Sequence, residues 1–240
     1  MATVLLLRHG LTAMTGPVLA GRTPGVDLDE RGVEQAQSVA QRLAGIALSA
    51  VVTSPLERCA QTAKRVLAMQ HSEGRKPVRR SERRLLECDY GDWTGQKIAT
   101  LIKHPLWKVV QANPSAATFP NGESMSAMAS RAVAAIRRLD AEFESSFGPD
   151  AVWLACSHGD VIKAILADAL GMHLDLFQRI VVDPCSVSAI RYTSGRPFVL
   201  TLNEAGGDPA RFVPPRTSQG RRRRGSSDAT IGGGAGGGSV

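Results

Sequence analysis

The sequence predicts an α/β fold with a mostly parallel central sheet, and two observations support this. Three short apolar runs, residues 4–7, 50–53 and 151–156, are too short for helices and are typical of strands buried on both faces. Each run is followed by a segment whose apolar residues recur with helical spacing. Strands that alternate with helices indicate βαβ units, which place the strands parallel to one another.

The first half of the chain follows this alternation. Gly, Pro and Thr are frequent over residues 11–25, which predicts a loop after the first strand. Asp29 is a predicted N-cap, because its side chain can accept a hydrogen bond from the first turn of a helix. The elements expected next are a helix over 30–44, a strand over 50–53, a helix over 55–69 and a short strand near 78–81.

The second half adds one long helix and a final pair of strands. Gly148 and Pro149 are expected to end a long amphipathic helix. The expected elements are helical material from 96 to about 112, a Pro-containing loop over 113–122, the long helix over 123–147, a strand over 151–156, a helix over 161–170 and antiparallel strands over 186–192 and 198–202.

The 240-residue chain is predicted to form one domain over residues 1–203, followed by a disordered Pro-, Arg- and Gly-rich tail over 204–240. The net charge is +7, yet residues 1–203 contain 23 Lys and Arg against 19 Asp and Glu. Much of the excess therefore comes from Arg221–Arg224. We interpret the tail as a solvated appendage, with a tether for an anionic partner as the alternative, and expect no nucleic-acid partner.

The cysteines and the N-terminal segment bear on the compartment. The four cysteines have neither CxxC nor zinc-finger spacing and are expected to be free thiols in a reducing compartment: Cys59, Cys88, Cys156 and Cys185. The first residues lack the basic and long apolar regions of a signal peptide, and no segment approaches the length of a membrane span. We therefore expect a cytoplasmic protein that makes no membrane contact.

Basic and imidazole side chains follow the three buried strands. Arg8 and His9 end the first strand, Arg58 lies about one turn into the helix after the second, and His158 follows the third. Ligands of open α/β sheets bind beyond the carboxyl ends of the strands, and helix N-termini favour anions. The sequence therefore predicts an anion site formed by these side chains.

These motifs resemble the histidine phosphatase superfamily, in its phosphoglycerate-mutase-like group. The resemblance covers about residues 3–202 and is carried by Arg8-His9-Gly10, Ser54-Pro55-Leu56-x-Arg58, Glu87 in Leu-x-Glu-x-x-x-Gly-x-Trp-x-Gly, and Ser157-His158-Gly159. It implies a three-layer α/β/α sandwich, a phosphohistidine intermediate, and neither a metal nor another cofactor. By position it implies that His9 is the nucleophile, that Glu87 is the proton donor, and that Arg8, Arg58 and His158 form the phosphate pocket, with His158 also among the catalytic residues.

The proposed chemistry requires His9 to be neutral while Glu87 is protonated. With ordinary pKa values near 4.3 and 6.5, at about pH 5.4 each group is in the required form only ~7% of the time, and both together ~0.5%. We therefore expect Arg8 and Arg58 to lower the pKa of His9 and partial burial to raise that of Glu87.

Other residues near these motifs were weighed as alternatives. The rivals of Glu87 for the acid are Glu82, Asp89 and Asp92. Trp93 is predicted to be a packing anchor rather than a substrate platform. The remaining histidines lack motif context and are expected at the surface or at helix ends: His71, His104 and His173.

The chain departs from the family pattern after Gly10. Many members have Glu at the next position and Asn four positions after that, where this chain has Leu11 and Thr15. Thr12 keeps the usual hydroxyl, and Thr15 is a candidate for a phosphate contact. Leu11 suggests a drier or differently shaped entrance.

The function predicted from the resemblance is hydrolysis of a small-molecule phosphate monoester. True mutases of the family carry a longer insertion with arginines between the acid motif and the long helix, whereas residues 96–121 are short here. Water could then reach the phosphohistidine. Phosphoglycerate mutase-type transfer is the first alternative and a module that binds phosphorylated ligands without catalysis is the second. The walls of the substrate pocket are expected from residues 11–25 and 96–121. The sequence identifies neither the substrate nor the oligomeric state, and a homo-oligomer is possible.

Overall fold

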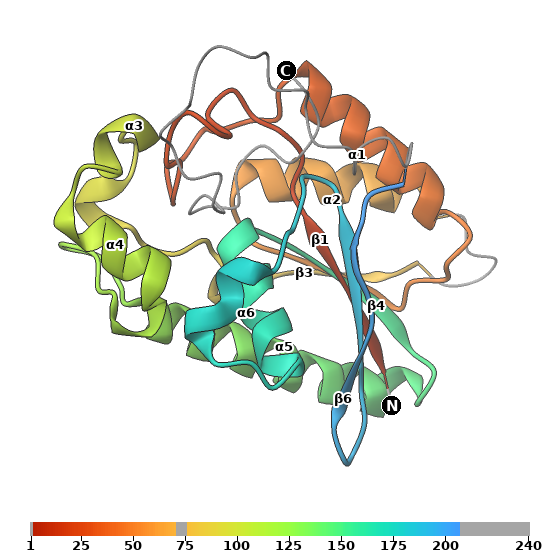
Figure 1. Ribbon diagram of the computed structural model, residues 1–240. Coiled ribbons are helices and arrows are strands. Elements are labelled where there is room, and N and C mark those ends of the chain that lie inside the picture. Colours follow the sequence, from red (N-terminus) through yellow and green to blue (C-terminus); the bar gives the residue numbers. More distant parts are fainter. Residues whose placement is uncertain (1, 71–75, 207–240) are drawn as a thin grey trace, which may run out of the picture.

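The computed structural model describes residues 2–70 and 76–206, and His71 and most of the predicted tail lie outside these ranges. The described chain forms a central sheet between two layers of helices (Figure 1). The strands are β1 (Thr3–Arg8), β2 (Ala50–Thr53), β3 (Val78–Ser81), β4 (Val152–Ser157), β5 (Val187–Tyr192) and β6 (Pro197–Glu204).

The helices lie between the strands in the order that the sequence predicts. The α-helices are α1 (Glu30–Leu43), α2 (Glu57–Met69), α3 (Ile98–Leu101), α4 (Pro105–Ala112), α5 (Met125–Phe147) and α6 (Gly159–Ala169). Short 3₁₀ helices are η1 (Arg83–Leu85), η2 (Gly91–Trp93), η3 (Pro114–Ala116) and η4 (Leu174–Arg179).

The six strands have the order β3-β2-β4-β1-β5-β6. The four strands β3, β2, β4 and β1 are parallel, and β5 and β6 are antiparallel to their neighbours. The mostly parallel sheet expected from the sequence is confirmed. Arg8 is the register partner of Ser157, and Thr53 that of Cys156, so the carboxyl ends of β1, β2 and β4 meet at one edge.

The central strands of the sheet are buried on both faces, which confirms the three-layer architecture. Along β1, Leu5 and Leu7 pack into the core beneath α1 and α2, whereas Val4 and Leu6 pack into the core beneath α5 and α6. Because successive strand residues point to opposite faces, a continuous apolar run satisfies both layers at once.

The predicted elements agree with the structure, apart from shifts of one or two residues at several ends and one break within a predicted helical stretch. Two helices, α3 and α4, replace the single stretch expected over 96–112, because Pro105 begins a new helix after the His104 cap. Helix α2 begins at Glu57, two residues later than expected. Strand β6 continues through Glu204, two residues past its expected end, and so includes the first residue of the expected tail.

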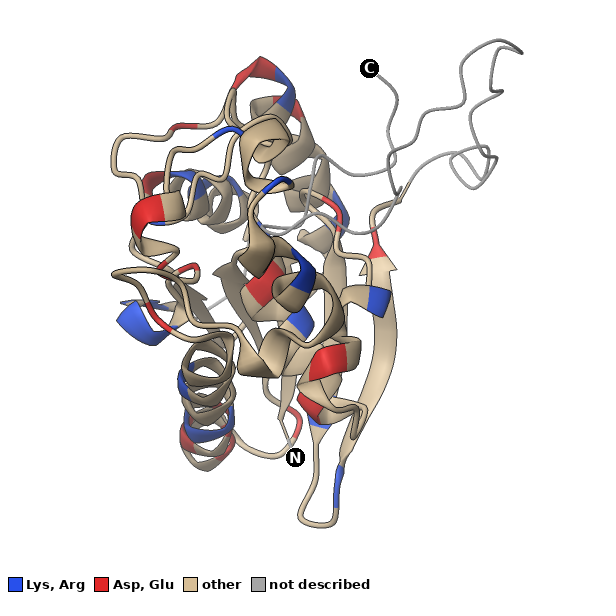
Figure 2. Ribbon diagram, turned by 60° about the vertical axis from the view of Figure 1, so that its left-hand side comes forward, with Lys and Arg blue, Asp and Glu red and all other residues tan. Residues whose placement is uncertain are grey.

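Helix ends follow their capping residues. Asp29 caps α1, as expected, through a 2.7 Å hydrogen bond from Gly32 N, and Gly148 ends α5 with a φ of 95°. Arg, Asp and Glu side chains all occur along α5 (Figure 2). Arg138 and Glu142 of this helix form an ion pair. Charges of both signs are typical of the solvated face of an amphipathic helix.

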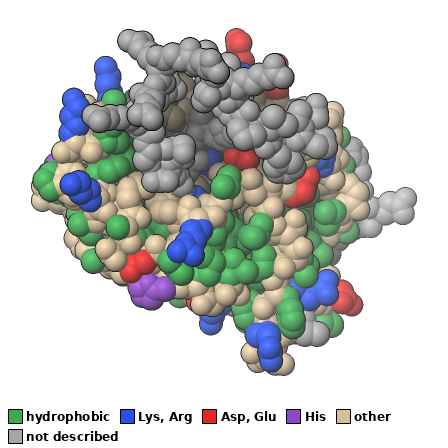
Figure 3. Space-filling model, in the orientation of Figure 1, with side chains coloured by type: hydrophobic (Ala, Val, Ile, Leu, Met, Phe, Trp, Pro, Cys, Tyr) green, Lys and Arg blue, Asp and Glu red, His purple; other side chains and the backbone are tan. Residues whose placement is uncertain are grey.

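The surface mixes charged and apolar side chains. Hydrophobic side chains lie among charged ones on the face that carries α6 (Figure 3). All four cysteines are free and buried. Within residues 2–70 and 76–206, none of the helices is both long and apolar enough to cross a bilayer.

Candidate active site

Strand ends bring the predicted site residues together at the carboxyl edge of the sheet. Arg8 and His9 stand at the end of β1, Arg58 is the second residue of α2, and His158 follows β4. The backbone turns away from β1 at Gly10, where an added Cβ would lie 2.6 Å from the Gly32 carbonyl oxygen. The packing of α1 against this turn therefore fixes where the His9 ring stands.

The two imidazoles are neighbours. The His9 and His158 ring centroids lie 5.2 Å apart with an interplanar angle of 62°. His9 Nδ1 lies 2.7 Å from the Gly10 carbonyl oxygen, and His9 Nε2 lies 3.3 Å from Arg58 Nε. A carbonyl only accepts and a guanidinium only donates, so this network assigns the proton to Nδ1 and a lone pair to Nε2.

The same reasoning assigns the tautomer of His158. Its Nδ1 lies 3.3 Å from Arg58 Nη2, and its Nε2 lies 2.8 Å from Ser54 Oγ. Arg58 donates, so Nδ1 accepts and Nε2–H donates to the serine hydroxyl. Both imidazoles are therefore neutral in this arrangement, and Arg58 links them.

The two guanidiniums are almost fully buried. Arg8 and Arg58 are each 1% exposed. Arg8 Nη1 donates to the Val182 carbonyl oxygen at 2.8 Å, and Arg58 Nη2 donates to that of Gly21 at 2.7 Å. Among the described residues Arg58 Nη1 has no hydrogen-bond partner. Buried cations with a spare donor favour an anionic ligand, and guanidinium geometry suits a phosphate.

Glu87 supplies the carboxyl of the site. It is 3% exposed and follows η1 in a segment without helix or strand geometry, and its Oε1 accepts from Cys88 N at 3.0 Å. Behind it, Tyr90 donates its hydroxyl to Asp160 Oδ2 at 2.7 Å, and both of these residues are fully buried. The carboxylate of Asp160 therefore adds negative charge to the surroundings of Glu87.

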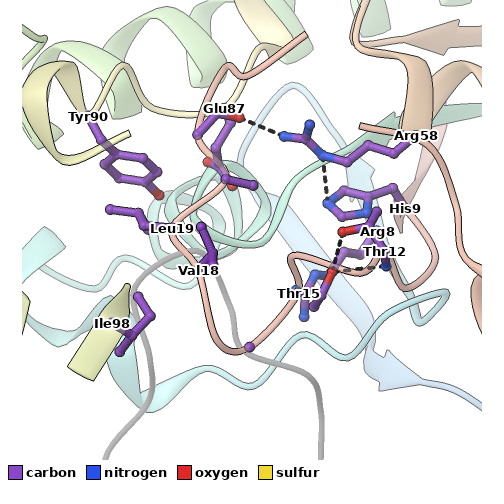
Figure 4. Close-up of a pocket in the computed structure, with 13 residues that line it drawn as sticks. Arg8, His9, Thr12, Thr15, Val18, Leu19, Arg58, Glu87, Tyr90 and Ile98 are labelled. Atoms are coloured by element: carbon purple, nitrogen blue, oxygen red, sulfur yellow. Dashed lines mark hydrogen bonds between the residues drawn. The ribbon is translucent and has the colours of Figure 1, made fainter. Parts of the chain in front are cut away.

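Arg8, His9, Arg58 and Glu87 line one small pocket with about 30 Å³ of free volume (Figure 4). His158 is not among the lining residues and lies behind them, in contact with His9 and Arg58. Arg8, His9 and Arg58 lie on one side of the pocket, and an apolar wall faces them. The other lining residues are Thr12, Thr15, Gly16, Val18, Leu19, Ala20, Gly21, Glu87, Tyr90 and Ile98. Arg8 and Arg58 are the cations among these lining residues.

The pocket wall pairs two segments that are far apart in sequence. Leu19 N donates to the Gln96 carbonyl oxygen at 2.9 Å, and Ile98 N donates to that of Pro17 at 3.0 Å. Thr12 and Thr15 lie on the floor with their hydroxyl oxygens 2.9 Å apart. The walls therefore come from 11–25 and 96–98, within the two segments expected from the sequence.

Burial and charge shift the pKa values of His9 and Glu87 in opposite directions. Burial, then Arg58 and Arg8, lowers the pKa of His9 well below its usual range, against the Gly10 hydrogen bond. Burial, with the nearby Asp160 charge, raises the pKa of Glu87 to about 7. At pH 7 about half of the Glu87 carboxyls are protonated while His9 is neutral. Both directions agree with the sequence-based expectation, with burial as the largest cause.

His158 carries no charge in this setting. Burial, followed by the charge of Arg58, lowers its pKa well below the usual value. A phosphate dianion beside it would raise that pKa again, because an opposite charge favours the protonated imidazole.

Of the four candidates for the acid, Glu87 is the one that lines the pocket. Glu82 pairs with Arg138, Asp89 pairs with Arg22, and Asp92 accepts from Asn121, and none of the three lines the pocket. Trp93 is buried beside Trp107 and Phe119, as expected for a packing anchor. His104 caps α4 and His173 caps η4, as expected for helix-end residues.

The sequence analysis assigned no role to several residues of the site. Ser54 and Cys59 contact the His158 ring, with Cys59 Sγ 3.5 Å from Nε2. Tyr90 and Asp160 form the buried pair behind Glu87. Ser54 is the first residue of the Ser54-Pro55-Leu56-x-Arg58 motif and Asp160 directly follows Gly159, so their positions were a usable hint, whereas the pairing of Tyr90 with Asp160 depends on the fold.

Comparisons with known proteins identify the sequence family of this arrangement. The family model of the histidine phosphatase superfamily (branch 1) matches residues 4–205. Phosphoserine phosphatase 1 of Hydrogenobacter thermophilus is 29% identical over 208 residues, which cover 85% of this chain and 92% of that protein. A probable phosphoglycerate mutase, GpmB, of Proteus mirabilis is 30% identical over 198 residues, which cover 80% and 86%.

Solved structures share the fold. The alpha-ribazole phosphatase of Shigella flexneri aligns with a TM-score of 0.70 and 27% identity over 86% of this chain and 99% of that one. A mycobacterial glucosyl-3-phosphoglycerate phosphatase aligns with a TM-score of 0.72 over 84% and 98%, and at 23% identity it bears on the fold alone.

Proposed function

The chain belongs to branch 1 of the histidine phosphatase superfamily, and we propose that it is a metal-independent phosphomonoester hydrolase with a phosphohistidine intermediate on His9. One observation carries the proposal. His9 Nε2 presents a lone pair, with Nδ1 bound to the Gly10 carbonyl, in a pocket that also holds Arg8, Arg58 and the partly protonated Glu87.

In the first step the neutral His9 attacks the phosphorus of the bound ester. Phosphate oxygens are stronger acceptors than a neutral imidazole, so they take over the Arg58 donors and release the Nε2 lone pair. The new N–P bond forms as the ester P–O bond breaks. Arg8, Arg58 and His158 stabilise the charge on the equatorial oxygens, and such electrostatic stabilisation dominates phosphoryl transfer.

Glu87 supplies the proton that the departing oxygen needs. The electron pair of the broken P–O bond goes to the ester oxygen, which takes the carboxyl proton and leaves as an alcohol. A carboxyl with a pKa of about 7 is suited to this at neutral pH, because enough of it is protonated and it still donates readily.

The second step reverses these roles. The Glu87 carboxylate takes a proton from water, the water oxygen attacks phosphorus, and the N–P bond breaks with its electron pair returning to His9 Nε2. Inorganic phosphate leaves and both groups regain their starting protonation. The net reaction consumes one water and converts a phosphate monoester into an alcohol and phosphate.

The residues that line the pocket favour the hydrolase proposal over phosphoryl transfer to a second acceptor. A phosphoglycerate substrate carries a carboxylate as well as its phosphate, and the lining residues besides Arg8 and Arg58 include no further Lys or Arg. The opposite wall is largely apolar, with Val18, Leu19 and Ile98. The similarity to a probable phosphoglycerate mutase keeps transfer as the second candidate.

The decisive experiment is to trap the intermediate. A ³²P-labelled monoester should label the wild-type protein in a rapid base quench, since phosphohistidine survives alkali and is lost in acid. His9→Ala should take up no label and should release no phosphate from a panel of metabolites. Label retained in His9→Ala would contradict the proposal.

The same preparations separate the alternatives. Turnover of 3-phosphoglycerate that depends on a bisphosphorylated glycerate would indicate the mutase. Tight ligand binding by the wild type without phosphate release from any ester would indicate a binding module.

A further inference from the structure

Two arginines from distant parts of the chain hold the main chain at Glu87. Arg22 Nε donates to the Glu87 carbonyl oxygen at 2.9 Å, and Arg131 Nη2 donates to the same oxygen at 3.1 Å. Arg22 lies in the loop after β1, directly after Gly21 of the pocket wall, and Arg131 lies in α5. A single carbonyl therefore receives two charge-assisted hydrogen bonds.

Arg131 also holds the residues just before Glu87. Its Nη1 donates to the carbonyl oxygens of Arg84 and Leu86 at 2.6 and 2.8 Å. Neither helix nor strand geometry fixes the backbone from Leu86 to Tyr90. The guanidinium therefore supplies the fixing hydrogen bonds that regular secondary structure supplies elsewhere.

Glu123 joins the two guanidiniums into one cluster. Its Oε1 accepts from Arg22 Nη2 at 2.8 Å and from Asp89 N at 2.8 Å, and its Oε2 accepts from Arg131 Nε at 3.0 Å. The side chains of Glu123, Arg131 and Arg22 are 18, 19 and 31% exposed. Linked, half-buried charges of this kind hold their geometry better than an isolated surface pair.

The segment after Glu87 packs against the loop before α5 that carries Glu123. Glu123 N donates to the Asp89 carbonyl oxygen at 2.9 Å. An added Cβ at Gly91 would lie 2.0 Å from the Pro120 carbonyl oxygen, and one at Gly122 would lie 2.3 Å from that of Asp89. Backbone packs directly on backbone here, so the chain is fixed on both sides of the carboxyl-bearing residue.

We propose that Arg131, together with Arg22 and Glu123, is a positioning residue for the acid of the reaction. It does not line the pocket, and it acts by fixing the backbone that carries Glu87, so that the carboxyl meets the departing oxygen. The inference rests on the proposed hydrolase function. A displacement of about 1 Å in a catalytic group can cost on the order of 100-fold in rate.

The test compares Arg131→Lys with Arg137→Lys. Lysine keeps the charge but has a single donor atom, so it cannot hold three carbonyls and a carboxylate at once. Arg137 lies on the same helix and pairs with Asp168, away from the pocket, so it is a matched control. Because Glu87 also acts in the second step, which both esters share, the rate to compare is that of phosphohistidine formation in the first turnover. Arg131→Lys should slow this step for an alkyl phosphate by on the order of 10- to 100-fold, and for p-nitrophenyl phosphate by less than about threefold. Arg137→Lys should change neither rate.

A double variant separates positioning from general damage to the fold. Once Glu87→Gln has removed the acid, there is no proton donor left to position, so Arg131→Lys should slow phosphohistidine formation from the alkyl ester by less than about a further twofold. Equal slowing of both esters by Arg131→Lys, or a full additional loss in the double variant, would overturn the proposal. If Arg131→Lys does not fold, Arg22→Lys decides by the same measurements.

The outcomes also separate this proposal from the hydrolase assignment. A wild type that hydrolyses neither ester contradicts the assigned function itself. A wild type that forms phosphohistidine, with Arg131→Lys affecting both esters alike, contradicts the positioning role alone.

Discussion

At the residue scale, the proposed nucleophile His9 and the proposed proton donor Glu87 would have pKa values in the wrong order in water. Glu ordinarily loses its proton below pH 5 and His gains one below about 6.5. Burial disfavours the charged form of each, which raises the pKa of Glu87 and lowers that of His9. Arg8 and Arg58 reinforce the shift at His9, and Asp160 reinforces the shift at Glu87. Neutral nucleophile and protonated acid therefore coexist near pH 7.

Glu87→Gln should expose the role of the carboxyl through the choice of leaving group. Formation of phosphohistidine from an alkyl phosphate should slow by on the order of 10²- to 10⁴-fold, because the alkoxide then leaves without a proton. Formation from p-nitrophenyl phosphate should slow far less, since its leaving group is stable as an anion. Rapid-quench measurement of the first turnover gives both rates.

Glu82→Gln is the control for this comparison. Glu82 lies five residues before Glu87 and pairs with Arg138 outside the pocket. It should leave both rates unchanged. Equal slowing of both esters by Glu87→Gln would remove Glu87 as the proton donor.

At the scale of elements, the start of α1 fits against the turn that carries His9. Gly32 lies in the first turn of α1, and an added Cβ would lie 2.0 Å from the Leu11 carbonyl oxygen. An added Cβ at Gly10 would in turn lie 2.6 Å from the Gly32 carbonyl oxygen. Glycine is therefore required at both positions by the close approach of two backbones.

Gly32→Ala should destabilise the protein although Ala is the better helix former. The gain in helix propensity, about 1 kcal/mol, is smaller than the cost of moving α1 away from the turn, which we expect to leave a net loss of roughly 1–3 kcal/mol. Urea denaturation measures the free energy of unfolding. Gly45→Ala is the control, because an added Cβ there meets no atom within 4 Å, and it should be neutral or slightly stabilising. Equal stability of the Gly32 variant and the wild type would contradict this close fit.

At the scale of the whole molecule, the buried site makes stability depend on pH in two opposing ways. His9 and His158 have lowered pKa values when folded, so below about pH 6.5 the unfolded chain binds protons that the folded chain does not. Their contribution to stability is lost as the pH falls. Glu87, with its pKa raised to about 7, contributes stability that is lost as the pH rises through 7.

The rise in unfolding free energy between pH 5 and pH 7 should therefore differ among variants. In Glu87→Gln the opposing contribution is gone, so the rise should exceed that of the wild type. In His158→Gln one of the two histidine contributions is gone, so the rise should be smaller. Each proton difference changes the slope by at most about 1.4 kcal/mol per pH unit. Equal slopes in all three proteins, from urea denaturation at several pH values, would contradict the assigned pKa shifts.

Local sequence patterns were enough to predict the central strands and most of the helices. The runs at β1, β2 and β4 are apolar because both faces of a central strand are buried, so composition alone identifies them. Capping by Asp29 and the stop at Gly148 depend on neighbouring residues and were equally readable. The break between α3 and α4 was missed, since Pro105 can begin a helix as well as interrupt one.

The sequence by itself determined the order of strands and helices and the placement of Arg8, His9, Arg58 and His158 at strand and helix ends, because apolar patterning and terminal motifs are properties of neighbouring residues. Only the tertiary structure decided that Glu87, and not Glu82, Asp89 or Asp92, faces the pocket. It alone also determined the histidine tautomers and the hold that Arg22 and Arg131 have on the acid segment. The physical reason is that hydrogen bonds between residues 44 to 104 positions apart depend on the path of the folded chain, which local spacing does not encode.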